Sequence, residues 1–308
     1  MEIPAKLGRI KEIKFILKKF LDNLKYKELS DDYINCCKNT IKNLFKYFKI
    51  NNVNHISKVT NDNIFGYILT LDKYSQGTRY NRVSKIKIFF KFIYLNNITS
   101  KDISLAIPKM KINHNKKIPN TIWSANEICR MRDCIDTSTT IGIRDYAIFM
   151  LLTNLGLRFS DVKNLKFEDI DWQMNLLNIT QNKTKKIVTL PLLNDVGIAI
   201  INYIKKGRPN VDSKYIFLNR KDEKFSAKSS FYHIFQKYLK LANIDTSNKK
   251  YIGTHSLRHS LASTLLQNRV PLSTISNILG HTDINNTAIY LKVDIPSLRE
   301  CCLTMEVD

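Results

Sequence analysis

The chain has 308 residues and a formal net charge of +22, and 44% of its residues are hydrophobic. This length is enough for two ordinary domains, each with its own core. No apolar run approaches the roughly eighteen residues that a membrane span needs, and the polar N-terminus does not resemble a signal peptide. The composition therefore argues against an integral membrane protein and predicts a folded protein with a polyanionic partner.

The positive charge is concentrated in the first part of the chain. Residues 1–118 contain 24 Lys and Arg against 9 Asp and Glu, whereas residues 119–308 contain 25 against 18. An AT-rich genome could supply lysines without selection for binding, but codon bias alone would not deplete acidic residues so strongly in one segment. A basic field of this size attracts nucleic acid and makes its binding depend on salt. Nucleic acid is therefore the expected partner, and an anionic membrane surface is the main alternative.

The cysteines indicate a reducing compartment. None forms a CxxC pair, and no spacing of Cys and His suits zinc. Two adjacent pairs on predicted helices, Cys36–Cys37 and Cys301–Cys302, are typical of small buried hydrophobic residues. We therefore expect a cytoplasmic protein without a metal site.

The first domain is predicted to be all-helical and to span residues 1–107. Apolar residues recur at helical spacing in four segments, residues 10–24, 33–48, 62–71 and 78–93. The basic candidates for contact with a DNA backbone are Lys38, Lys42, Arg79, Arg82, Lys85 and Lys87. Any one of these side chains more typically covers a solvated helix surface, so the prediction rests on the ensemble.

A linker is expected over residues 108–120, where Pro108 and Pro119 flank a basic stretch with little periodicity. The second domain is predicted to span residues 121–308 and to open with a capping box at Ser124 and Glu127. Its further helices are expected at residues 141–156, 160–166, 194–206, 228–242, 256–267, 271–279 and 285–292. Short strands are expected at residues 175–180, 187–190 and 215–218.

The first chemically informative segment is Asn154-Leu-Gly-Leu-Arg158-Phe-Ser-Asp161. A glycine and then an arginine at a helix break place a guanidinium in a confined position, and Asp161, one turn away, can buttress it. The alternative is an ordinary Arg–Asp pair at i, i+3, which stabilises a helix by roughly a few tenths of a kcal/mol. Lys183 lies on the polar turn between the first two predicted strands, where a lysine is usually solvated but can also reach a leaving oxygen.

A second group of candidate residues lies near the C-terminus. His255 and Arg258 are three residues apart at the start of a predicted helix and therefore share a face. His259 could join either side of that helix, and we interpret it as structural support. His281 follows a glycine that is typical of a helix C-terminus. Tyr290 lies on the next predicted helix, where a lone tyrosine is most often a half-buried core residue.

Together these segments resemble the tyrosine recombinase family, the phage-integrase class of DNA strand transferases. The resemblance is close over residues 119–303, and the basic segment before them is similar to that family's core-binding domain. The family's motif residues match, in order and with appropriate gaps, at Arg158, Lys183, His255, Arg258, His281 and Tyr290. The resemblance implies a mainly α fold with a small β-sheet. In this fold a SAM-like helical domain and a mixed α/β catalytic domain form a two-domain clamp.

The resemblance also implies how these residues would act on a phosphodiester. Arg158 and Arg258 would grip the non-bridging oxygens and stabilise the charge that builds on them, and His281 would add a hydrogen bond. Asp161 and His259 would support them.

The remaining three residues would move the proton and form the covalent bond. His255 would assist proton removal from Tyr290, Tyr290 would attack the phosphate, and Lys183 would protonate the departing 5′ oxygen. The product would be a 3′-phosphotyrosyl link and a free 5′ hydroxyl. A second 5′ hydroxyl can reverse the attack, so the implied reaction needs neither ATP nor a metal nor another cofactor.

The implied biological role is that of a site-specific DNA recombinase, an integrase or transposase of a mobile element. Such an enzyme would act as a homotetramer on two paired sites of double-stranded DNA. The tail after Tyr290 is expected to form a short amphipathic helix that packs on a neighbouring subunit or, alternatively, on its own domain. The motifs do not distinguish this role from a Xer-like resolvase of replicon multimers. A non-catalytic DNA-binding protein with the same fold is a third interpretation, which the intact motif positions disfavour.

Overall fold

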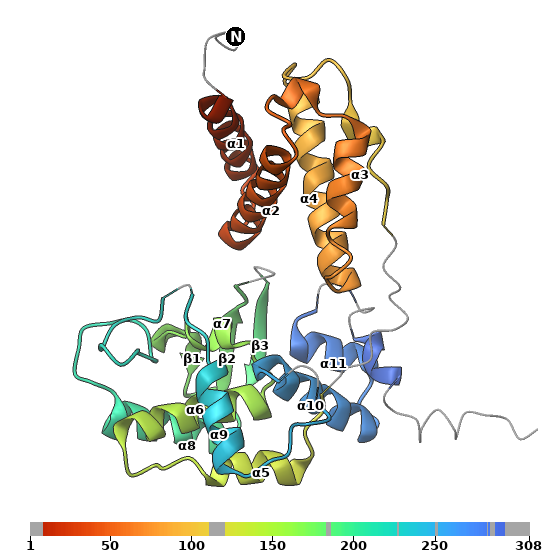
Figure 1. The fold of residues 1–308 in the computed structure, drawn as a ribbon. Coiled ribbons are helices and arrows are strands. Elements are labelled where there is room, and N and C mark those ends of the chain that lie inside the picture. Colours follow the sequence, from red (N-terminus) through yellow and green to blue (C-terminus); the bar gives the residue numbers. More distant parts are fainter. Residues whose placement is uncertain are drawn as a thin grey trace, which may run out of the picture. The chain divides into compact units, whose positions relative to one another are not determined.

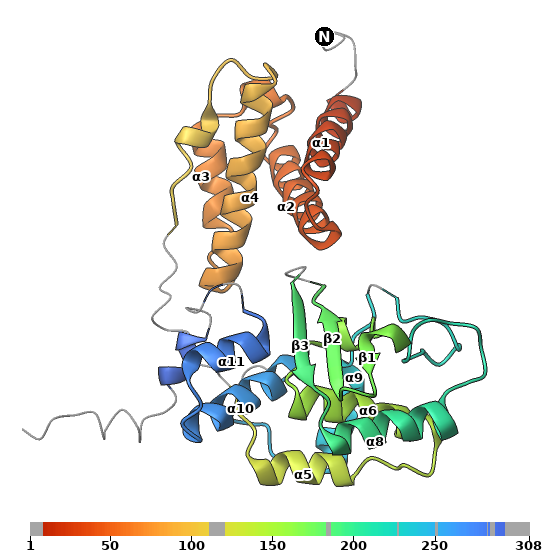
Figure 2. The same cartoon turned by 180° about the vertical axis from the view of Figure 1, so that it is seen from behind.

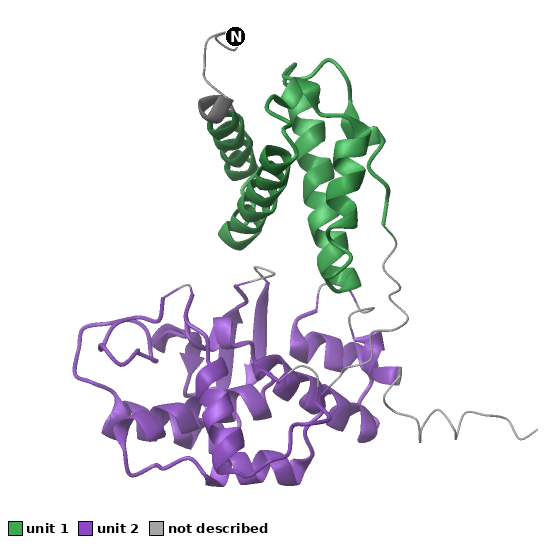
Figure 3. Cartoon of the chain, in the orientation of Figure 1, with its two compact units in different colours: residues 1–114 green, residues 115–308 purple. Residues whose placement is uncertain are grey.

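The computed structural model describes residues 9–110, 121–182, 186–226, 228–249, 252–281, 283 and 287–292. The chain divides into two compact units, residues 1–114 and 115–308, which Figure 3 colours separately. This division falls within the predicted linker, of which residues 111–120 lie outside the described ones. Among the described residues, no helix combines the length and the hydropathy of a membrane span.

Unit 1 is built from helices whose apolar faces meet in one core (Figure 1). Its α-helices are α1 (Arg9–Tyr26), α2 (Asp31–Ile50), α3 (Asn61–Leu69) and α4 (Gln76–Leu95). Phe89 of α4 lies at the centre of this core, where the rings of Phe20 and Phe45 meet it edge-on at centroid distances of 5.2 Å and 5.7 Å. The helices predicted from the apolar spacing in this part of the chain are thus confirmed.

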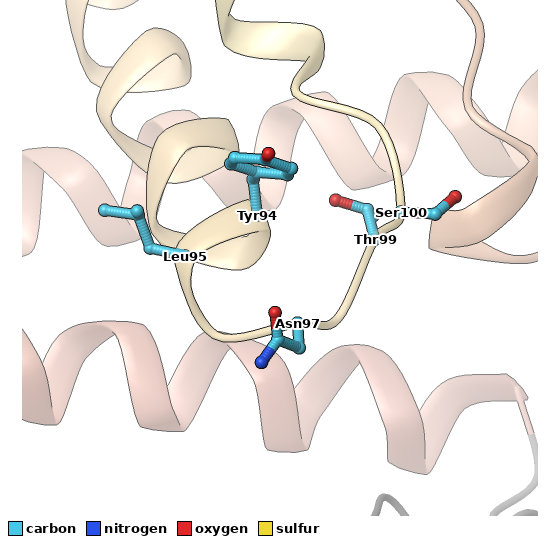
Figure 4. A pocket seen from close by; sticks show the side chains of 5 residues that line it. All are labelled: Tyr94, Leu95, Asn97, Thr99 and Ser100. Atoms are coloured by element: carbon cyan, nitrogen blue, oxygen red, sulfur yellow. The ribbon is translucent and has the colours of Figure 1, made fainter.

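A surface pocket lies where α4 ends (Figure 4). Its lining residues are Tyr94, Leu95, Asn97, Thr99 and Ser100. All of them are uncharged, so the pocket offers no cation to a phosphate. None of the predicted site residues lines it.

Unit 2 packs a small antiparallel sheet against helices (Figures 1 and 2). The strands β1 (Ile170–Asp171), β2 (Leu176–Thr180) and β3 (Ile187–Pro191) lie in the order β1-β2-β3. The helices are α5 (Ala125–Asp133), α6 (Thr140–Asn154), α7 (Phe159–Val162), α8 (Asn194–Asn202), α9 (Tyr232–Leu241), α10 (Thr254–Gln267) and α11 (Leu272–Leu279). Helix α6 is buried along most of its length and packs against α8 and α10. A mainly helical fold with a small sheet is the fold class that the sequence predicts.

Helix α10 is held in place by Trp123, the residue before the N-cap of α5. The predicted capping box is present, because Ser124 Oγ accepts the Glu127 N–H at 3.2 Å and Glu127 Oε2 accepts the Ser124 N–H at 2.8 Å. Immediately before it, the Trp123 indole N–H donates to Ser256 Oγ at 2.6 Å, and the Trp123 backbone N–H donates to Ser260 Oγ at 2.7 Å. Both serines lie on α10, so Trp123 fixes the helix that carries most of the predicted C-terminal site residues.

The predicted strand at residues 215–218 is wrong. Tyr215 and Leu218 form only isolated bridges with other residues. The guanidinium of Arg208 donates to the carbonyls of Tyr215 and Ile216 at 3.2 Å and 3.1 Å. These carbonyls are therefore bound by a side chain instead of a neighbouring strand, and a β-ladder does not form.

Other differences concern the ends of elements. Helix α7 stops at Val162 and α9 starts only at Tyr232, so both are shorter than predicted, and the two-residue β1 is not predicted at all. Helix α8 continues as a π-helix over Tyr203–Gly207, and the last element, Ala288–Lys292, is a 3-10 helix.

The predicted burial of the cysteine pairs holds only in part. Cys37 is buried and Cys36 is exposed, because successive residues of a helix point in different directions. Cys301 and Cys302 lie outside the described residues.

Candidate active site

Arg158 lies in the tight connection between α6 and α7. Helix α6 ends at Asn154, and Gly156 adopts a φ of 60°, a conformation that favours glycine. A Cβ at this position would also lie only 2.8 Å from Leu261 Cδ2. Arg158 then becomes the residue that precedes α7, with its side chain 11% exposed. The break between the helices thus confines the guanidinium.

Two side chains flank this guanidinium. The buried Asp161 carboxylate lies 3.9 Å from Arg158 Nη1, which is an ion pair at longer than hydrogen-bond distance. The other Asp161 oxygen accepts the backbone N–H of Asn182 at 2.9 Å. Arg158 Nη1 itself donates to Gln181 Oε1 at 2.8 Å. Asp161 therefore lies where the predicted buttress requires, whereas the contact with Gln181 is not predicted.

Arg258 lies on the buried face of α10 and is only 3% exposed. Its Nη1 donates to the Gly156 carbonyl at 2.7 Å, and its Nη2 donates to the Leu279 carbonyl. Burial lowers the pKa of Arg258 to about 10; the nearby Arg158 adds to this effect, while Tyr290 and Asp161 oppose it. The guanidinium is therefore charged at neutral pH, and the two carbonyls fix its orientation.

Tyr290 is almost fully buried, at 1% exposure, and its hydroxyl meets His259. The distance from Tyr290 Oη to His259 Nδ1 is 2.8 Å. Burial raises the pKa of Tyr290 to about 12, although Arg258 and then Arg158 act to lower it. Burial also lowers the pKa of His259 to about 4, and His255 and Arg258 add to this effect. At neutral pH the pair is thus a neutral imidazole and a protonated phenol, close to both arginines.

His281 is tied to the segment that carries Tyr290. Gly280 ends α11 in the left-handed conformation, with a φ of 58°, and so releases His281 from the helix, as predicted. His281 Nδ1 is 2.7 Å from the hydroxyl of Thr287, and the carbonyl of Thr287 accepts the Tyr290 N–H at 3.0 Å. One buried threonine therefore links the histidine to the tyrosine.

A family model for the phage integrase family matches residues 123–295. The chain belongs to this family. Its curated relatives include the putative integrase/recombinase y4rF of Sinorhizobium fredii, 32% identical over 74% of this chain and 54% of the relative. Tyrosine recombinase XerD of Oceanobacillus iheyensis is 28% identical over 88% of this chain and 91% of the relative. The chain thus spans about half the length of y4rF and nearly all of XerD.

Solved structures of a site-specific recombinase and of an integrase have the same fold. The XerH site-specific recombinase bound to palindromic difH substrate matches with a TM-score of 0.71 and 18% identity, over 98% of both chains. A lambda integrase (75-356) dimer bound to a COC' core site matches with a TM-score of 0.63 and 16% identity, over 88% of this chain and 95% of that one. At these identities the likeness establishes the fold, and it confirms the predicted fold class.

The six residues predicted to match the family's motifs fall into three groups in this structure. Arg158, Arg258 and Tyr290 gather in one buried cluster, and His281 is linked to it through a threonine. His255 is exposed in the first turn of α10, although it lies close enough to His259 to lower its pKa. Lys183 lies outside the described residues.

His259, interpreted from the sequence as structural support, is instead the direct partner of the Tyr290 hydroxyl. The sequence alone does not reveal this contact, because it joins two elements whose packing has to be known.

Most of the basic candidates of unit 1 are already engaged within the unit. Lys85 is only 6% exposed and donates to the Asn81 carbonyl, so it does not fit a contact with DNA. Arg79 pairs with Asp72, Arg82 stacks on the ring of Tyr74 and Lys87 donates to the Ile107 carbonyl. Lys42 is exposed and Lys38 is half-buried. Lys42 is thus the best-placed of these candidates for a phosphate contact.

Gln181 is a residue of the candidate site that is not predicted from the sequence, although the sequence holds a signal for it. Along β2, Leu177 and Ile179 are buried, and the alternation of a strand places Gln181 on the same face. A buried amide needs hydrogen-bond partners. The period-two pattern therefore extends one residue beyond the strand, into what looks like a solvated turn.

Proposed function

We propose that this protein cuts and rejoins double-stranded DNA at specific sites through a covalent bond between Tyr290 and a 3′ phosphate. The proposal rests on one observation above all. A single buried tyrosine hydroxyl is hydrogen-bonded to a histidine and lies within the electrostatic influence of two arginines. A phosphodiester carries one negative charge and two non-bridging oxygens, which a pair of guanidinium groups can bind from two sides.

In the proposed step, Tyr290 Oη attacks phosphorus while the bond from phosphorus to the 5′ oxygen breaks. Arg158 and Arg258 stabilise the charge that develops on the non-bridging oxygens, and His281 adds a hydrogen bond. Lys183 supplies the proton that the leaving 5′ oxygen takes up. The phosphotyrosyl bond retains the energy of the broken one, so a 5′ hydroxyl from another strand can reverse the step.

We assign the removal of the phenolic proton to His259 in place of His255. His259 Nδ1 is 2.8 Å from Tyr290 Oη, within the reach that a general base needs. The pKa of His259, lowered to about 4, keeps the imidazole neutral, and with its own proton on Nε2 it can accept one on Nδ1. His255, exposed at the start of α10, is better placed to meet the DNA.

The basic residues of unit 1 would supply much of the binding to the DNA backbone, with Lys42 as a leading contact. As in the tyrosine recombinases generally, we expect four copies on two paired sites, with the tail after Tyr290 docking on a neighbouring copy. Because its substrate is DNA, the protein would work in the cytoplasm.

Two biological roles remain, and different relatives favour each. The likeness to putative integrase/recombinases favours movement of a mobile element, and it reaches 37% identity over 68% of this chain. Relatives named XerD and XerC, of which the chain covers about nine-tenths, favour a resolvase of replicon multimers. Sequencing the DNA junctions that form in cells expressing the protein separates the two, because integration joins unlike sites and resolution joins like ones.

The chemistry is tested with a nicked suicide duplex built from such a junction. Wild-type protein should form a denaturant-resistant adduct and release an end that polynucleotide kinase labels without phosphatase treatment. Tyr290→Phe should bind the duplex normally and form no adduct, whereas the exposed Tyr232→Phe should behave as wild type. An adduct formed by Tyr290→Phe would overturn the choice of nucleophile, and a wild-type protein that forms none would overturn the proposed function.

A further inference from the structure

One amide joins the two arginines of the candidate active site. Gln181 is 1% exposed, its Oε1 accepts from Arg158 Nη1 at 2.8 Å, and its Nε2 donates to the Leu279 carbonyl at 3.1 Å. The same Leu279 carbonyl accepts from Arg258 Nη2. A continuous chain of hydrogen bonds therefore runs from one guanidinium to the other through a single side chain and a single carbonyl.

The orientation of this amide is dictated by its partners. A guanidinium only donates and a carbonyl oxygen only accepts, so the amide oxygen must face Arg158 and the amide nitrogen must face Leu279. A rotation by half a turn would set donor against donor and acceptor against acceptor. No other side chain of this length presents one acceptor and one donor from the same end, because Glu lacks the donor and Met lacks both.

The surrounding backbone is shaped to hold the amide. The Gln181 N–H donates to the Lys186 carbonyl at 2.8 Å, and the next N–H, that of Asn182, donates to Asp161 at 2.9 Å. On the other side, Gly280 lies so close that a Cβ would overlap the Gln181 amide. Gln181 is thus fixed at its backbone and enclosed around its side-chain amide.

We propose that Gln181 is a positioning residue that sets the separation and the tilt of Arg158 relative to Arg258, so that both can bind the same phosphate. This inference rests on the proposed function. Gln181 also joins the β2–β3 hairpin to the end of α11, which His281 follows two residues later. A phosphate clamp built on three separate elements is held together at Gln181.

The alternative is a purely structural role, in which Gln181 only satisfies the hydrogen bonds of buried polar groups and supports the fold. The two roles differ in how its loss combines with the loss of Arg158. If Gln181 acts by positioning Arg158, substitution of Gln181 should slow adduct formation little further in a protein that already lacks Arg158. If Gln181 instead supports the fold independently of Arg158, the fold-decreases in rate of the two single variants should multiply in the double variant.

The test is a double-mutant cycle of Arg158→Ala and Gln181→Met, measured as the single-turnover rate of adduct formation on the suicide duplex. Gln181→Met should slow adduct formation by about 10- to 100-fold, as a small misplacement of a binding group does, with duplex affinity nearly unchanged. The double variant should be no more than a few-fold slower than Arg158→Ala. Gln173→Met, at an exposed glutamine of the same domain, should keep the wild-type rate.

An unchanged rate in Gln181→Met, or losses that multiply in the double variant, would overturn the inference. If Gln181→Met does not fold, Gln181→Glu takes its place in the same cycle, because it keeps the length and the acceptor for Arg158 but cannot donate to Leu279. A wild-type protein that forms no adduct contradicts the proposed function itself. A wild-type adduct with no effect of Gln181 contradicts this inference alone.

Discussion

The pair formed by the half-buried His259 and the buried Tyr290 should make unit 2 sensitive to acid. The pKa of His259 is lowered to about 4 in the folded chain, against about 6.5 in an unfolded one. The neutral imidazole therefore stabilises the fold fully above pH 6.5. This contribution is lost as the pH falls from 6.5 towards 4, because the unfolded chain binds the proton first.

The size of the effect follows from the two pKa values. The whole shift corresponds to about 3 kcal/mol, and about 2 kcal/mol of it should be lost between pH 8 and pH 5. The groups that act on this imidazole are His255 and Arg258 from its own helix, and Tyr290 from the element packed against it. Burial opposes its protonation most strongly, and His255 and then Arg258 add to this effect.

The measurement is urea unfolding followed by tryptophan fluorescence. Trp123 and Trp172 are the only tryptophans of the sequence and both belong to unit 2, so the signal reports on this unit within the full chain. His259→Asn keeps a polar group near the position of Nδ1 but does not titrate. Between pH 8 and pH 5 it should lose about 2 kcal/mol less unfolding free energy than wild type.

An exposed histidine provides the control for this measurement. His233→Asn, on the solvent side of α9, should retain the pH dependence of the wild-type protein. If His259→Asn also retained this pH dependence, the imidazole of His259 would not be held neutral by the fold, which would refute the prediction.

Three further predictions concern residues within unit 1 or within unit 2. Asp145→Asn leaves the buried Arg144 without its carboxylate and should lower the unfolding free energy by about 3 kcal/mol in the same urea assay. Gly280→Ala places a methyl group at a positive φ and against a buried amide, and should slow adduct formation more than it weakens duplex binding. Lys42→Ala should reduce the slope of log affinity against log salt by about 1, whereas Lys85→Ala, at a buried lysine, should lower stability and leave the slope unchanged.

The helical architecture could be predicted because local periodicity and core packing agree. In unit 1 the residues that recur at helical spacing are the ones that fill the core, and Phe89 is an example. The capping box at Ser124 is equally local, since it needs only residues three apart, and it is present. Where the local preference of a segment agrees with its packing in the fold, the sequence is sufficient to predict its structure.

The errors arise where a distant side chain changes the outcome. The segment at residues 215–218 has the composition of a strand, but Arg208 binds its carbonyls. Lys85 occupies a helix position where lysine is usually solvated, yet the fold buries it beside the ring of Tyr33. Neither contact has a local signature.

The candidate site shows the same division. Arg158, Arg258 and Tyr290 could be selected from motifs because the chemistry of a phosphate limits which side chains are useful, and the structure brings these three side chains close together. The partners of these groups cannot be read in this way. His255 and His259 are four residues apart and share a face of α10, so which of them meets the phenol depends on where along α10 the last 3-10 helix packs.

The properties of the pair also bear on how the proposed attack can proceed. Burial raises the pKa of Tyr290 to about 12 and lowers that of His259 to about 4, so a complete proton transfer from Tyr290 to His259 before the attack is unfavourable. A phosphate that approaches the two arginines adds negative charge next to the phenol, which makes an early phenolate still less favourable. The proton should therefore leave Tyr290 while the bond to phosphorus forms, when the charge passes to oxygens that Arg158 and Arg258 can bind. A buried, protonated tyrosine with a weakly basic partner is unreactive by itself and gains reactivity only as a phosphate enters the arginine pair.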